Sequence, residues 1–86
     1  MKFALVTNPN HPQAAEKLEA LLGLIGDAEL EEATAQLLGR EGRPLPELQG
    51  ELLLTLGGDG TLLYALSQLD LPVFGINIGQ VGFLTE

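Results

Sequence analysis

The residues of this sequence that could do chemistry lie in two glycine-rich segments. Residues 57–61 read Gly-Gly-Asp-Gly-Thr, and residues 79–82 read Gly-Gln-Val-Gly. A glycine turn between a strand and a helix can point several backbone N–H groups at one anion, and the helix start adds its own unpaired N–H groups. Neither the Walker lysine pattern nor G-x-G-x-x-G is present. The positions expected to cradle a phosphate are Gly57, Gly58, Gly60 and Thr61.

Asp59 stands in the middle of the first glycine run, where a simple anion site would not place a negative charge. A carboxylate beside a phosphate site can hold Mg²⁺ or accept a hydroxyl proton during phosphoryl transfer. The alternative is an Asx turn, in which the side chain bonds its own backbone. Three glycines around it, directly after an apolar run, favour the functional interpretation. Thr61 is expected to be the helix cap, a phosphate ligand, or both.

The segments around these turns predict how the chain positions them. Apolar runs at residues 2–7, 51–56 and 73–78 predict buried strands, and helical apolar spacing follows the first two runs. Such alternation indicates an α/β fold with a mostly parallel sheet of three or four strands covered by helices on both faces. Both glycine turns then lie at the carboxyl edge of the sheet, where open α/β sheets bind ligands.

The stretch after the first expected helix is ambiguous. Residues 27–38 fit a helix, but a short strand over residues 28–31 followed by one helical turn fits almost as well. Asn10 is expected to cap the first helix, and Gly26 to end it. The composition of residues 39–50 predicts a loop.

Composition excludes several functions. The chain has 86 residues, 12 acidic and 4 basic, with a formal net charge of −8, which argues against binding nucleic acid or an anionic membrane. It has no cysteine, so it has neither a disulfide framework nor a thiolate metal site. Its aliphatic runs are far shorter than the ~20 residues of a membrane span. Its N-terminal apolar run is also too short for a secretory signal, which needs about 7–15 residues, so we expect a cytoplasmic protein.

Both motifs resemble those of a known family. Residues 57–63, Gly-Gly-Asp-Gly-Thr-Leu-Leu, resemble the signature of the superfamily that groups NAD kinases with diacylglycerol- and sphingosine-type lipid kinases and 6-phosphofructokinases. Residues 75–85, Gly-Ile-Asn-Ile-Gly-Gln-Val-Gly-Phe-Leu-Thr, are similar to the second conserved block of NAD kinases, where lipid kinases would show a Pro-x-Gly-Thr-x-Asn-type segment. Residues 4–9 are similar to the first strand of the same family, so the resemblance covers the whole chain.

The resemblance implies a 6-phosphofructokinase-like N-terminal domain and a phosphoryl transfer. The family transfers phosphate from ATP or polyphosphate to the 2′-hydroxyl of the adenosine ribose of NAD, giving NADP, normally with Mg²⁺. By position, Asp59 matches the catalytic residue, Asp59 and Gly60 match the NAD-contacting pair, and Phe83 matches an aromatic position near the adenine. Core packing is the alternative for Phe83. Asn77 and Gly79 are expected to support the second turn.

The sequence also departs from the family. Members have a second, β-rich domain with an Asn-Glu pair, so we expect residues 1–86 to be an N-terminal α/β nucleotide-binding fragment that is inactive alone. No basic residue adjoins a glycine turn, so Mg²⁺ or other sequence must balance the phosphate charge. The alternatives are a non-catalytic piece that binds nucleotide or a partner chain, and a lipid or sugar kinase of the same superfamily. The parent protein is expected to be a homo-oligomer.

Overall fold

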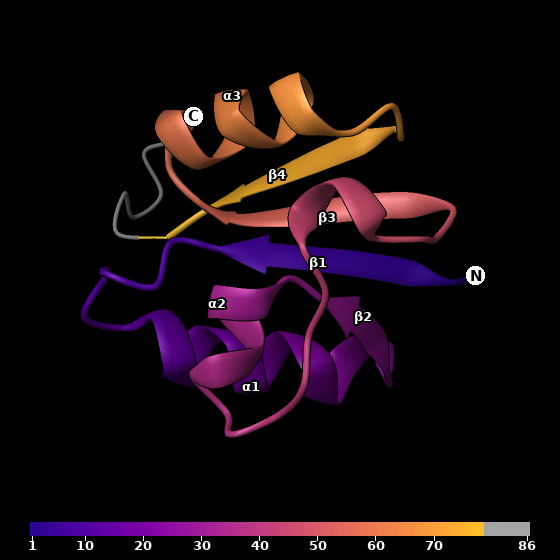
Figure 1. Ribbon diagram of the computed structural model, residues 1–86. Coiled ribbons are helices and arrows are strands. Elements are labelled where there is room, and N and C mark those ends of the chain that lie inside the picture. The colour runs from indigo at the N-terminus through magenta and orange to yellow at the C-terminus, as the bar shows by residue number, and fades with distance from the viewer. Residues whose placement is uncertain (79–86) are drawn as a thin grey trace.

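The structure is a computed structural model that describes residues 1–78, and its core is a sheet of four parallel strands in the order β2-β1-β3-β4 (Figure 1). This arrangement confirms the predicted α/β class. The elements along the chain are β1 (Phe3–Thr7), α1 (Ala14–Ile25), β2 (Ala28–Leu30), α2 (Glu32–Gln36), the 3₁₀ helix η1 (Leu45–Glu47), β3 (Leu52–Gly57), α3 (Asp59–Gln68) and β4 (Val73–Asn77).

The two central strands, β1 and β3, are buried along most of their length because helices cover both faces of the sheet (Figure 1). Leu5 is paired with Leu54, and both point to the face covered by α1, where they pack with Leu18 and Leu22. Burying one such leucine side chain contributes about 1.5–3 kcal/mol.

The opposite face is covered by α3 and η1. Ala4 of β1 and Leu53 of β3 pack there against Ala65 of α3 and Leu45 of η1. Because neighbouring residues of a strand point to opposite faces, one apolar run supplies both cores. This explains why these strands are continuous hydrophobic runs rather than alternating ones.

The structure decides the ambiguity over residues 27–38 in favour of the short strand. β2 covers Ala28–Leu30, and the five-residue helix α2 follows it. The Glu31 carboxylate caps α2 by accepting hydrogen bonds from the backbone N–H groups of Ala33 and Thr34, both at 3.0 Å. β2 is also held from outside, because the N–H of Arg43 donates to the carbonyl of Leu30 at 2.9 Å.

The expectation that Asn10 caps the first helix is wrong. α1 begins only at Ala14, after Gln13. The Asn8 side chain accepts a hydrogen bond from the N–H of Asn10 at 3.0 Å, and this Asx turn keeps the following residues out of the helix. The end of the helix agrees with the sequence, since Gly26 follows Ile25 with a φ of 90° that favours glycine.

Between residues 1 and 78, no helix has the length and apolar character that crossing a membrane requires.

Candidate functional site

The connection between β3 and α3 is a tight turn at the carboxyl edge of the sheet. β3 ends at Gly57 and α3 begins at Asp59, so Gly58 alone separates them. Gly58 is the N-cap residue and offers no side chain to the first turn of the helix. The first N–H groups of α3 have no partner within the helix, and unpaired groups of this kind are the donors that anion sites at helix N-termini use.

Thr61 is not the helix cap that the sequence suggested, because it lies inside the first turn of α3. Its side chain packs against Gly57 instead. A Cβ placed on Gly57 would lie 2.6 Å from Thr61 Oγ1, which is closer than real contacts allow. Gly57 therefore has to be glycine for strand and helix to approach this closely.

Asp59 is the first residue of α3, and its side chain is exposed. Its carboxylate makes no hydrogen bond to any residue of the described part of the chain, 1–78, so the Asx-turn alternative is not realised there. A negative side chain in the first turn of a helix is favoured by the helix dipole. The arrangement places an exposed carboxylate, without a hydrogen bond to residues 1–78, at the start of α3.

Two hollows flank this turn, one on each side. The side towards β4 has a hollow of about 80 Å³, lined by Asp59, Gly75 and Asn77 among others. The side towards β1 has a larger hollow of about 400 Å³, to which Gly60 and Thr61 contribute. Asp59 therefore lines one hollow, and Gly60 and Thr61 line the other.

The larger hollow contains residues that the sequence did not single out as a site. Its walls come from the end of β1, from the start of α2 and from α3, whose Tyr64 is 55% exposed. Asn8 and Pro9 were noted only as part of a resemblance. Their position directly after a buried strand was the available signal, because every parallel strand ends at this same edge. The residues that line the hollow are Val6, Thr7, Asn8, Pro9, Glu31, Ala33, Gly60, Thr61 and Tyr64.

The second motif begins beside the first. Asn77 is the last residue of β4, is paired with Gly57 in the sheet, and is exposed. The N–H of Ile78 donates to the carbonyl of Gly57 at 3.2 Å, which ties the two motifs together. Gly79 and Phe83 lie outside the described residues.

Comparison with known proteins agrees with this geometry. The family model described as "ATP-NAD kinase N-terminal domain" matches residues 3–86. This chain belongs to the NAD kinase family. No solved structure matches it.

Several relatives named NAD kinase match almost the entire chain. That of Methanoculleus marisnigri is 39% identical over 92 residues, which cover 100% of this chain and 34% of the relative. That of Thermoplasma acidophilum is 35% identical over 89 residues, covering 100% of this chain and 33% of the relative. That of Chromohalobacter salexigens is 40% identical over 97 residues, covering 98% of this chain and 33% of the relative. The chain thus spans about a third of the length of these NAD kinases.

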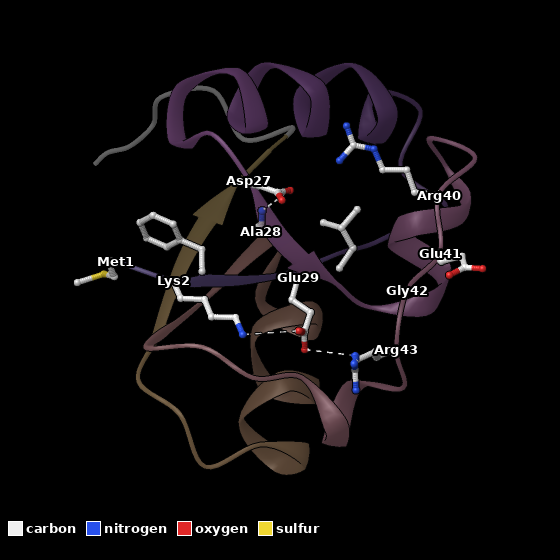
Figure 2. A pocket seen from close by; sticks show the side chains of 11 residues that line it. Met1, Lys2, Asp27, Ala28, Glu29, Arg40, Glu41, Gly42 and Arg43 are labelled. Carbon is white, nitrogen blue, oxygen red and sulfur yellow. Dashed lines mark hydrogen bonds and ion pairs between the residues drawn. The ribbon is translucent and has the colours of Figure 1, made fainter.

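The cationic side chains of this NAD kinase family member gather away from the glycine turn. Three of its four basic residues, Lys2, Arg40 and Arg43, line a cavity of about 610 Å³ beside the amino ends of β1 and β2. Figure 2 shows Lys2 and Arg43 reaching towards Glu29, with N–O distances of 4.0 and 3.8 Å. Lys2 and Arg43 therefore form ion pairs, and Arg40 lies near them, at the amino edge of the sheet, opposite the glycine turn.

Within residues 1–78, no group of three or more His, Cys, Asp or Glu side chains is placed to hold a metal ion. Asp59 is the carboxylate that lines the small hollow, and a single carboxylate is not a magnesium site by itself.

Proposed function

We propose that this chain is the N-terminal part of an NAD kinase that phosphorylates the 2′-hydroxyl of the adenosine ribose of NAD, giving NADP. The observation that carries the proposal is the Asp59 carboxylate, exposed and free of hydrogen bonds within residues 1–78, at the start of a helix whose glycine turn has a hollow on each side. The names of the relatives support the same reaction.

Asp59 is proposed to act on the acceptor. The ribose 2′-oxygen attacks the γ-phosphorus of ATP, a new O–P bond forms, and the bond to the bridging oxygen breaks to release ADP. The hydroxyl proton passes to the Asp59 carboxylate and from there to solvent. In this role Asp59 and Gly60 contact NAD.

The glycine turn is proposed to hold the transferred phosphoryl group. The unpaired N–H groups at the start of α3 point towards the position where negative charge increases during transfer, and they are fixed there before the reaction. Gly57, Gly58, Gly60 and Thr61 are the residues of this cradle. The donor is proposed to be ATP or polyphosphate, since backbone N–H groups recognise phosphate rather than a base.

Mg²⁺ is proposed to enter with the phosphates of the donor rather than on a resident protein site. This fits the lack of a clustered metal site among residues 1–78. It also fits the net charge of −8, which leaves two anionic substrates with little cationic compensation from this part of the protein.

The second motif is proposed to support the acceptor. Asn77 lines the same hollow as Asp59 and is hydrogen-bonded in the sheet next to Gly57, which suits a residue that braces the turn together with Gly79. The resemblance implies that the ring of Phe83 lies near the adenine, where a flat apolar ring can stack on a base.

Residues 1–86 are proposed to be the α/β nucleotide-binding domain of a larger cytoplasmic protein, assembled as a homo-oligomer. The relatives are about three times as long as the matched segment. The alternative for the isolated chain is binding of nucleotide without turnover, which is favoured by the scarcity of cations near the turn.

The test is an assay of NADP formation by the full-length protein that contains this chain. NAD is the acceptor, ATP and polyphosphate are compared as donors, and Mg²⁺ is varied. Diacylglycerol and fructose 6-phosphate serve as acceptors for the lipid- and sugar-kinase alternatives. We expect NADP with at least one donor and no product with either alternative acceptor. Phosphorylation of the lipid or the sugar instead of NAD would contradict the proposal.

A further inference from the structure

A buried threonine hydroxyl lies behind the candidate site, at the junction of three elements. Thr34 of α2 is 0% exposed. Its Oγ1 donates to Glu31 Oε1 at 2.9 Å and accepts from the backbone N–H of Thr7 at 2.9 Å. The direction of these bonds is fixed, because a carboxylate can only accept and a backbone N–H can only donate.

The geometry of the sheet explains why Thr7 needs this partner. Leu5 directs its carbonyl towards β2, where it accepts from the N–H of Glu31 at 3.1 Å. Thr7, two residues further along β1, directs its N–H to the same side, but β2 has already ended at Leu30. The Thr34 hydroxyl thus takes the place of the missing strand.

Thr7 links the end of β1 to the neighbouring strand β3 by a hydrogen bond of its side chain. Its own hydroxyl donates to the carbonyl of Leu56 at 2.5 Å, and the N–H of Asn8 donates to the same carbonyl at 3.2 Å. That carbonyl belongs to the peptide group that joins Leu56 to Gly57. The orientation of the first peptide group of the glycine turn is therefore set by side chains and backbone from β1.

We propose that Thr34 is a positioning residue for the phosphoryl transfer: it fixes the carboxyl end of β1, and through Thr7 the peptide group at Leu56 that leads into the turn holding Asp59. The inference rests on the proposed function. Thr34 touches neither substrate. It affects the reaction by fixing the position of the Asp59 carboxylate. Small displacements of a reacting group lower the rate strongly, since in-line transfer needs aligned atoms.

The kinetic test uses matched variants of the full-length protein. Thr34→Val keeps the shape but removes the hydroxyl, and Thr34→Ser restores it. Leu48→Ala is a destabilised control, because Leu48 is buried near η1 on the face covered by α3 and takes no part in the hydrogen-bond chain. All variants are assayed below their unfolding temperature.

We expect Thr34→Val to lower kcat about tenfold or more while the KM for NAD changes less than about threefold. Thr34→Ser should recover most of the kcat, and Leu48→Ala should lose thermal stability with kcat retained. An unchanged kcat in Thr34→Val would overturn the inference. So would an equal loss of kcat in Leu48→Ala, if the two variants have the same thermal stability.

Hydrogen–deuterium exchange provides a second readout that does not depend on catalysis. The peptide spanning residues 52–62 should exchange faster in Thr34→Val than in the wild type and in Thr34→Ser. Unchanged exchange there would overturn the positioning role even if activity fell. If the wild type forms no NADP, the proposed function fails, while the exchange result still decides whether Thr34 controls the turn.

Discussion

At the scale of single residues, the site depends on glycines that serve different purposes within one turn. Gly57 is required by contact, since Thr61 Oγ1 occupies the space of a Cβ there. Gly58 and Gly60 have open space around the Cβ position, and neither has a positive φ. A side chain at either position would therefore meet no other atom of residues 1–78, and the proposed function gives these glycines the role of leaving room for the substrates.

Gly57→Ala should destabilise the protein by about 1–3 kcal/mol, because the new methyl group overpacks against Thr61. Denaturant unfolding measures this loss. Adding Thr61→Ala removes the hydroxyl oxygen and should recover part of it. If Gly57→Ala were as stable as the wild type, the close strand–helix contact described here would be wrong.

Gly60→Val should leave folding nearly intact, since nothing lies within 4 Å of its Cβ position. The β-branched side chain would instead project into the hollow that Gly60 lines, where ribose and phosphate are proposed to approach, so binding of NAD should weaken about tenfold or more by calorimetry. Normal NAD affinity in this variant would argue against the acceptor approaching Gly60. Valine should not strain the backbone there, because Gly60 lies within α3 and has no positive φ.

At the scale of elements, the apolar runs and the glycines at their ends were sufficient to predict three of the strands and their parallel arrangement. They also predicted that the first motif lies at the edge of the sheet. The short strand β2 was not determined by pattern, because long-range contacts define it. The N–H of Arg43 bonds Leu30, and that of Glu32 bonds the carbonyl of Arg43. The hydrogen bond between Thr7 and Thr34 likewise joins residues 27 positions apart, and no local periodicity reports such a contact.

The loop that borders β2 offers a direct test of this packing. A Cβ on Gly42 would lie 2.7 Å from the carbonyl oxygen of Leu30 and 2.8 Å from Ala35 Cβ, so Gly42→Ala should cost about 2 kcal/mol or more. Gly23→Ala is the matched control, because Gly23 lies within α1 with nothing near its Cβ position and should gain about 0.5–1 kcal/mol in helix propensity. Thermal unfolding of the two variants should shift in opposite directions. Equal shifts would contradict the close approach of the loop.

At the scale of the whole molecule, β4 forms an open edge of the sheet that residues 1–78 build. β4 is paired with β3 on one edge and with no other strand among residues 1–78. Phe74 on this strand is 58% exposed, and Leu63 and Leu66 of α3 are 64% and 53% exposed. Phe74 pairs with Leu54 and so lies on the face covered by α1, opposite the face that carries α3 with Leu63 and Leu66. The open edge with Phe74 beside it is a surface that another segment or another chain can cover.

The 86-residue chain by itself should therefore self-associate through this edge. Sedimentation should show concentration-dependent oligomers, and Phe74→Lys should shift the chain towards monomer by placing a charge on the exposed face. Leu24→Lys is the control, since Leu24 is 84% exposed on α1 and is not part of β4. A stable monomer at all concentrations would show that this edge needs no cover.

The most direct test of the central claim is Asp59→Asn in the full-length protein. Asparagine has nearly the same size but does not accept the hydroxyl proton as a base. General-base catalysis typically contributes 10²–10⁴-fold, so kcat for NADP formation should fall by about that factor while unfolding and NAD affinity stay close to those of the wild type. NADP formation at a near-normal rate would contradict the role of the Asp59 carboxylate, and with it the mechanism proposed for this turn.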